Sequence, residues 1–206
     1  MKTTVLTALT VTALVASSQA INLTLSNNFS VGFVDNSGTA IPVGTGFAAA
    51  GTISDVDSLS VDTIGSSFSP IGANGGSFIP FANAANADGF TGGSIQGGRA
   101  DSMSMFVNQP IFVVLGNGTN LSDSDQFAVF ATGETFTADS GTPLESNITF
   151  QPGDNDTLLL GETGPTIPLN ALTRPSIQLV GGEVIPEPST GLLALLGLAG
   201  VLRRRR

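Results

Sequence analysis

Cysteine, histidine, tryptophan and tyrosine are all absent from this chain of 206 residues. Without cysteine the protein can form no disulfide and no thiolate metal site, and without histidine it lacks the usual zinc ligands. Ser-His-Asp and Cys-His catalysis are excluded for the same reason. A pair of carboxylates, as in glycoside hydrolysis, is the remaining arrangement. The tryptophan and tyrosine platforms common in sugar clefts are missing, so we expect a protein that is not an enzyme.

Positive charge is almost confined to the two ends of the sequence. The seven basic residues are Lys2, Arg99, Arg174, Arg203, Arg204, Arg205 and Arg206. Between Ile21 and Glu187, sixteen acidic residues face only two arginines, which leaves 14 net negative charges. Such a surface repels nucleic acid, whose binding requires Lys and Arg, and it attracts divalent cations. We therefore expect no nucleic-acid partner.

The first 20 residues have the layout of a secretory signal peptide. Lys2 supplies a positive start, and the weakly apolar stretch from Val5 to Ala16 is too short to span a bilayer durably. Ser18 and Ala20 are the small residues expected just before a cleavage site, which places the cut before Ile21. This segment predicts export through the Sec translocon and removal by signal peptidase.

The last residues hold three features in a fixed order. Pro186-Glu187-Pro188 is an extended tripeptide that is incompatible with a helix. The uncharged apolar run 190–202 follows; at about 1.5 Å per residue it covers about 20 Å, short of a hydrocarbon core of about 30 Å. The arginine cluster 203–206 would stay cytoplasmic by the positive-inside rule. We expect a short transmembrane helix at 190–202, with the body outside that membrane.

These three features together resemble the PEP-CTERM sorting signal of Gram-negative bacteria, over residues 183–206. The resemblance implies recognition by an exosortase, with Pro186, Glu187 and Pro188 as the sorting motif and the arginine cluster as the cytoplasmic stop. It also implies a precursor anchored in the inner membrane and later sorted to the cell surface or the extracellular space. Proteins with this signal are typically linked to exopolysaccharide and biofilm formation, which makes exopolysaccharide a candidate partner.

The body between the two signals, residues 21–182, has short apolar segments separated by frequent turns, with 26 Gly and 11 Pro in the chain. No long segment has helical periodicity. This pattern predicts an all-β fold, and we expect an antiparallel β-sandwich of jelly-roll type. The expected strands include Ile21–Leu25, Phe29–Val34, Phe47–Ile53, Phe127–Ala131, Thr135–Thr137, Ile148–Phe150, Leu158–Leu160 and Ile177–Val180.

The clearest strand is Ile111–Leu115, a continuous apolar run that ends at the turn Gly116-Asn117-Gly118. Such a run leaves no face for water, so it predicts an interior strand covered on both faces. The expected core includes Phe112, Val114, Phe127, Val129 and Phe150.

Other stretches have weaker patterns. Val56–Ile64 is expected to be a strand or a loop, and Asn117–Gln126 a hairpin loop. Residues 65–98 are rich in Gly, Asn and Ser, which predicts long loops fixed by phenylalanines and little order. Three prolines, Pro165, Pro168 and Pro175, are expected to interrupt regular structure before Ile177.

Three acidic clusters offer oxygen ligands at alternate positions, which suits Ca²⁺. Their residues are Asp55, Asp57 and Asp62, then Asp123 and Asp125, then Asp154, Asn155 and Asp156. None completes an EF-hand loop, and Asp and Asn are also ordinary turn residues. The segment starting at Gly44-Thr45-Gly46 matches a relaxed dinucleotide pattern, but no helix is expected after it, so we interpret it as a turn.

Three functional hypotheses remain for the body. The first is a non-enzymatic structural or interaction protein of the cell surface or extracellular matrix, which the sorting signal and the missing catalytic residues favour. The second is a Ca²⁺-dependent adhesin or polysaccharide-binding module, which would give the acidic clusters a role. The third is a glycosidase that works with carboxylates alone. No cofactor other than Ca²⁺ is expected.

Overall fold

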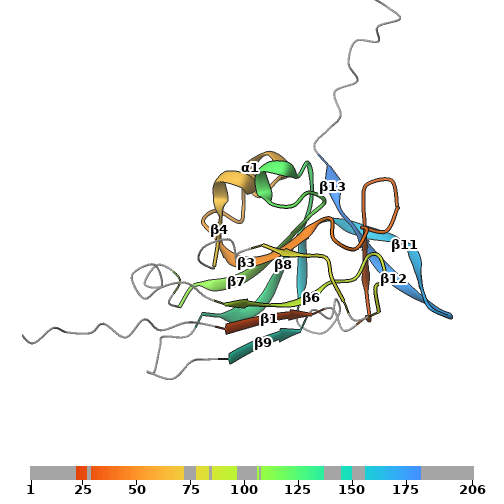
Figure 1. Cartoon of the computed structure of the whole chain (residues 1–206). Coiled ribbons are helices and arrows are strands. Elements are labelled where there is room, and N and C mark those ends of the chain that lie inside the picture. Colours follow the sequence, from red (N-terminus) through yellow and green to blue (C-terminus); the bar gives the residue numbers. More distant parts are fainter. Residues whose placement is uncertain are drawn as a thin grey trace, which may run out of the picture.

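The computed structural model describes residues 22–26, 29–71, 78–83, 85–96, 106, 108–136, 145–149 and 156–181 (Figure 1). The expected signal peptide, the core residue Phe150 and the sorting tail lie outside these residues. The described part consists mainly of β-strands, with one α-helix, α1 (Val61–Ser67), and one 3-10 helix, η1 (Leu121–Asp123). The all-β expectation is confirmed at this level, and the sandwich or jelly-roll arrangement stays a prediction.

A seven-stranded antiparallel sheet forms the centre of the body. Its strands lie in the order β10-β8-β7-β3-β4, with β13 paired to β8 and β5 paired to β3. They are β3 (Phe47–Ile53), β4 (Phe68–Pro70), β5 (Ile79–Pro80), β7 (Pro110–Gly116), β8 (Gln126–Thr135), β10 (Thr157–Leu160) and β13 (Val180–Gly181). The predicted strand Ile111–Leu115 is β7, and it lies between β3 and β8 as an interior strand.

Strand β7 supplies side chains to both faces of this sheet. Ile111, Val113 and Leu115 join one cluster of buried residues, and Phe112 and Val114 join a second cluster on the opposite face. Successive side chains of a strand point to opposite faces, so a run with no polar residue requires cover on both sides. The prediction of a doubly covered strand is confirmed.

Different elements cover the two faces. Ile64 of α1 and Phe68 of β4 belong to the cluster that contains Phe112, as do the predicted core residues Val114, Phe127 and Val129. On the other face, Phe33 packs edge-on against both Phe81 and Phe130, with ring centroids 5.9 and 6.2 Å apart. All four predicted core residues that the structure describes are therefore buried, each 5% exposed or less.

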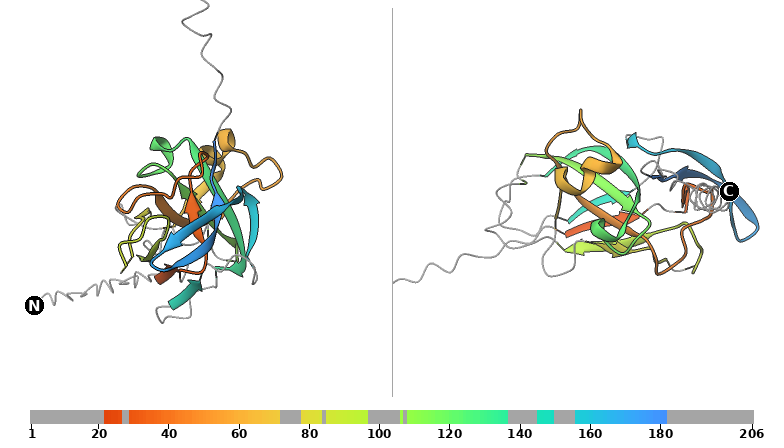
Figure 2. Two further views of the ribbon diagram at one scale, coloured as in Figure 1. Left: turned by 90° about the vertical axis from the view of Figure 1, so that its right-hand side faces the viewer. Right: turned by 90° about the horizontal axis from the view of Figure 1, so that it is seen from above.

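Two smaller sheets flank the central one (Figures 1 and 2). One contains β6 (Gly92–Gln96), β1 (Asn22–Ser26) and β9 (Glu145–Thr149), in that order. The other contains β11 (Glu162–Leu169), β12 (Leu172–Gln178) and β2 (Gly32–Val34), and its β11–β12 hairpin projects away from the central sheet. Antiparallel pairing was expected throughout, but β1–β9 and β12–β2 are parallel. Both parallel pairs join strands far apart in the sequence, which long connections permit.

The segment Val56–Ile64 contains no strand: it is a loop as far as Ser60, and helix α1, which neither expectation foresaw, begins at Val61. Ser60 caps this helix: its Oγ accepts from the N–H of Thr63 at 3.3 Å, and its own N–H donates to Thr63 Oγ1 at 2.9 Å. This reciprocal capping offsets the poor helix propensity of Gly65 and the serines that follow. The short helix then buries Ile64 completely.

The prolines before Ile177 do not prevent regular structure, so this prediction was wrong. Pro165 and Pro168 lie in β11, an edge strand, where a missing N–H can face solvent. The β11–β12 register shifts between Gly164 and Ile167, and Pro165 and Pro175 both fall within that irregular part of the ladder. The hairpin therefore places its prolines where few ladder hydrogen bonds are lost.

Further boundaries also differ from expectation: β2 begins only at Gly32, and Ile177–Val180 is divided between β12 and β13. Phe127–Ala131 and Thr135, expected in two separate strands, lie in the single strand β8, and Thr137 lies outside the described residues. A bulge between Ala131 and Thr135 accommodates the polar residues: Thr132 Oγ1 donates to the carbonyl of Ile111 at 2.9 Å, and Gly133 has φ +74°. The stretch 65–98 is more structured than expected, since it contributes β4, β5 and β6. Its phenylalanines do fix it, with Phe81 and Phe90 fully buried.

Candidate functional site

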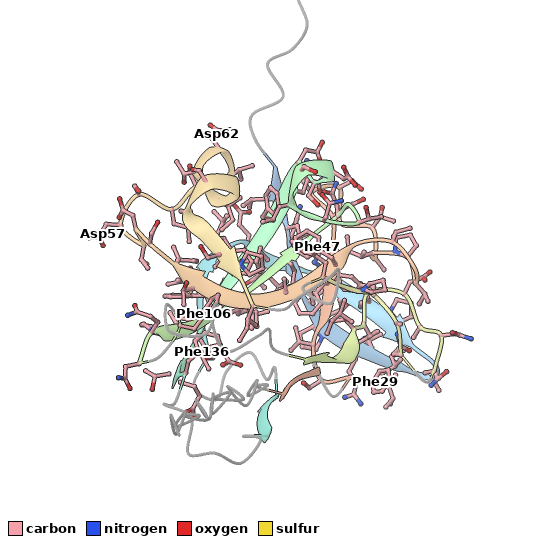
Figure 3. All side chains as sticks on the ribbon, turned by 60° about the vertical axis from the view of Figure 1, so that its left-hand side comes forward. Phe29, Phe47, Asp57, Asp62, Phe106 and Phe136 are labelled. Carbon is pink, nitrogen blue, oxygen red and sulfur yellow. The ribbon has the colours of Figure 1, made fainter. Side chains whose placement is uncertain are left out.

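The first predicted acidic cluster lies on the loop after β3 and in the first turn of α1. Asp57 points outward from the loop and Asp62 from the helix (Figure 3), and both are exposed. The carboxylate of Asp55 is hydrogen-bonded within its own loop: it accepts from Ser58 Oγ at 2.6 Å and from the Ser58 N–H at 3.3 Å. These hydrogen bonds from Ser58 lower the pKa of Asp55 below its ordinary value. Asp55 thus acts as the acceptor that closes a turn.

The second predicted cluster lies in the loop between β7 and β8, which has the expected hairpin character. Asp123 Oδ2 accepts from Thr119 Oγ1 at 2.7 Å and from Asn120 Nδ2 at 2.6 Å. Asp125 Oδ1 accepts from Asn117 Nδ2 at 2.7 Å. Both carboxylates are therefore hydrogen-bonded within the loop, and a cation would have to compete with these donors.

Of the third cluster, Asp154 and Asn155 lie outside the described residues, and Asp156 directly precedes β10. Within the described ranges, no group of three or more acidic side chains comes together in a way that could hold a metal ion. The described members of the first two clusters thus lie on separate segments, one at the start of α1 and the other between β7 and β8.

The segment Gly44-Thr45-Gly46 is a turn, as interpreted from the sequence. Gly44 and Gly46 have φ of +83° and +67°, and strand β3 rather than a helix follows at Phe47. A Cβ at Gly46 would come within 2.7 Å of side-chain atoms of Phe81, so the glycine is required by both conformation and space. No dinucleotide-binding helix exists here.

The structure also shows a hollow that sequence analysis missed, at the tip of the β11–β12 hairpin. It is lined by Phe29, Ala85, Leu169, Asn170, Ala171, Leu172 and Arg174. Asn170 turns the chain with φ +54°, which brings Leu169 and Leu172 opposite each other. Leu172 is 56% exposed, an unusual degree for a leucine in this body.

The hollow was not predicted from the sequence, because the prolines indicated irregular structure where the hairpin lies. Asn170 between two apolar residues was the available signal, since Asn tolerates the left-handed conformation that tight hairpins use. Arg174 is distinctive in the sequence as one of only two body arginines, but no sequence pattern predicted that it would lie near Phe29. Figure 3 shows Phe29 beside the end of the hairpin.

The sorting residues Pro186, Glu187, Pro188 and the arginines 203–206 lie outside the described residues, as do Ser18 and Ala20. The same holds for the expected membrane span 190–202. In the part of the chain that the structure describes, no helix is long and apolar enough to cross a membrane.

Comparison with known proteins identifies the C-terminal segment. No curated protein and no solved structure matches the chain. A family model does match residues 184–206, and that model describes the PEP-CTERM protein-sorting motif. The motif implies a secreted surface protein that exosortase processes and that is anchored at its C-terminal end before processing. The chain thus carries a PEP-CTERM protein-sorting motif at residues 184–206, as its sequence predicted.

Proposed function

We propose that this protein is a non-enzymatic structural or interaction protein of the cell surface or extracellular biofilm matrix. The observation that carries the proposal is the sorting motif at residues 184–206. A chain with this motif is delivered outside the cell, so its body works where reducing power and nucleotide cofactors are scarce. The lack of cysteine and histidine suits such a role and leaves few groups for catalysis.

The charge of the body supports the same proposal. The span from Ile21 to Glu187, which contains the body, carries 14 net negative charges, and these favour solubility and mutual repulsion of copies in a matrix. The described carboxylates Asp55, Asp123 and Asp125 accept hydrogen bonds from their own loops rather than converging on a cleft. Retaining glycosidases need two carboxyl groups about 5 Å apart across a substrate, so the hydrogen-bonding of these three gives the glycosidase hypothesis little support.

The proposal includes a processing route. The Sec translocon and signal peptidase would remove residues 1–20, and the inner membrane would hold the precursor through residues 190–202 until exosortase acts near Glu187. The two prolines around Glu187 keep the backbone extended, the form in which proteases bind substrates. Glu187 offers a carboxylate for a basic group of the enzyme.

Processing is tested by expressing the chain in a host that contains an exosortase and measuring the intact mass. We expect a mature product that begins near Ile21 and lacks Arg203–Arg206. Glu187→Ala should leave the precursor in the membrane fraction. Glu183→Ala is the matched control, because it removes a neighbouring carboxylate outside the tripeptide and should be processed normally. Equal processing of both variants would overturn the role of Glu187.

The role of the body is tested by deleting the gene and imaging cell aggregation and matrix. Loss of aggregation that the full chain restores, and that the Glu187→Ala variant does not, supports a matrix function that depends on sorting. Hydrolysis of a glycan by the purified protein, abolished by a single Asp or Glu substitution, would instead establish the glycosidase hypothesis.

A further inference from the structure

The hollow at the tip of the β11–β12 hairpin has a volume of about 460 Å³, within the range of small-molecule sites. Its walls are almost entirely carbon. Phe29 forms one wall and is held by Phe90, with ring centroids 5.6 Å apart. Leu169 forms another and belongs to the buried cluster that includes Phe90 and Ile167. The hollow therefore rests on a fixed part of the core, while Leu172 at its edge stays exposed.

Arg174 borders the hollow and is the one basic residue in the described part of the chain. Its Nε is buried and has no hydrogen-bond partner. A buried donor without an acceptor is costly, so this Nε has an unmet need for a hydrogen-bond acceptor. Turning it toward the hollow would break no hydrogen bond at Nε.

We propose that this hollow binds a small carboxylate with an apolar body, such as a short fatty acid. The apolar part would lie against Phe29, Leu169 and Leu172, where burial of carbon surface is favourable. The carboxylate would lie at the border and pair with Arg174, whose planar fork matches its geometry. A sugar fits less well, because the lining offers only the side chains of Asn170 and Arg174 to satisfy its many hydroxyl groups.

This inference is independent of the sorting motif and of the proposed matrix role. The site is shallow and borders solvent, so binding is expected to be weak, on the order of 1 mM for a ligand of this size. Selectivity is the informative quantity: a carboxylate should bind better than an uncharged molecule with the same carbon chain.

The test uses the full-length chain in phosphatidylcholine nanodiscs, titrated with hexanoate and, separately, with hexanol. Binding is followed by NMR through the backbone amides of Asn170, Ala171 and Leu172. We expect saturable shifts with hexanoate, at a dissociation constant at least fivefold lower than that for hexanol. Equal affinities for the two ligands, or no saturation with either, would overturn the proposal.

Three variants locate the charge that causes the preference. Arg174→Met keeps an apolar stem and should abolish the preference for hexanoate over hexanol. Arg174→Lys keeps the charge and should retain the preference. Arg99→Met, the matched control, removes the other body arginine and should bind as the parent protein does. If Arg174→Met fails to fold, loss of the preference in Arg99→Met or in Arg174→Lys still contradicts the assignment.

Discussion

Asn117 and Asp125 close the loop between β7 and β8 by three hydrogen bonds around one amide side chain. Asn117 Nδ2 donates to Asp125 Oδ1 at 2.7 Å, while Asn117 Oδ1 accepts from the N–H groups of Asp125 and Gln126 at 3.2 Å. The amide is needed because it offers donors and acceptors at once. A carboxylate in its place would face Asp125 with like charge.

Asn117→Asp is therefore expected to destabilise the protein more than Asn117→Ala at neutral pH. Each lost hydrogen bond costs about 0.5–1.5 kcal/mol, at the low end in an exposed loop. The free energy of unfolding is measured by chemical denaturation with far-ultraviolet circular dichroism. Thr173→Ala, at an exposed position of β12, is the control and should change stability little. Full stability of both Asn117 variants would contradict the closing role of this side chain.

Phe112→Ala is expected to lower the free energy of unfolding by roughly 3–5 kcal/mol. Phe112 is 5% exposed and lies in an interior strand beneath α1, where neighbours on both sides limit collapse of the cavity. Denaturant titration measures this loss in the free energy of unfolding. Phe78→Ala is the matched control: Phe78 packs against the same cluster, with its ring 5.0 Å from that of Phe47, but is only partly buried. A larger loss at Phe78 than at Phe112 would refute the core assignment.

The sequence predicted the inner strands β3 and β7 of the central sheet well because both are mainly apolar runs. Strand β3 has the predicted bounds Phe47–Ile53, and β7 extends one residue beyond the predicted Ile111–Leu115 at each end. In such runs the hydrophobic signal and the β-propensity agree, and burial on both faces leaves no alternative.

The missed elements depend on interactions that apolar pattern alone does not encode. Helix α1 is made possible by a cap between Ser60 and Thr63, although its residues have poor helix propensity. The β11–β12 hairpin tolerates prolines because β11 is an edge strand, a property of topology. Likewise, the hollow arises only when β12 brings Arg174 near Phe29, two residues far apart in the sequence.

Millimolar Ca²⁺ is expected to leave the melting temperature unchanged relative to Mg²⁺ at equal ionic strength. The carboxylates of Asp55, Asp123 and Asp125 already accept short hydrogen bonds, and among the described residues no three acids converge. Binding a cation to the native state alone would raise the melting temperature in proportion to its affinity. A rise with Ca²⁺ that Asp123→Asn removes and Asp57→Asn does not would establish a calcium site in the β7–β8 loop and favour the adhesin hypothesis.

The last prediction concerns Asp35 and acid stability. Its Oδ1 accepts from the N–H of Ser37 at 2.9 Å, from Ser37 Oγ at 2.6 Å and from the N–H of Thr39 at 2.9 Å. Burial by itself would raise the pKa of Asp35, but these hydrogen bonds outweigh it, and the pKa lies below the ordinary value of 3.8.

Because the folded-state pKa of Asp35 is the lower one, its charged form contributes stability that is fully present well above pH 3.8 and is lost as the pH falls through the folded-state pKa. Asp35→Asn removes this titration. The melting temperature of the parent protein should therefore fall more steeply between neutral pH and about pH 3 than that of Asp35→Asn. Asp57→Asn, an exposed carboxylate on another loop, serves as the control and should follow the parent. Parallel pH profiles for the parent and Asp35→Asn would show that these hydrogen bonds do not favour the charged carboxylate.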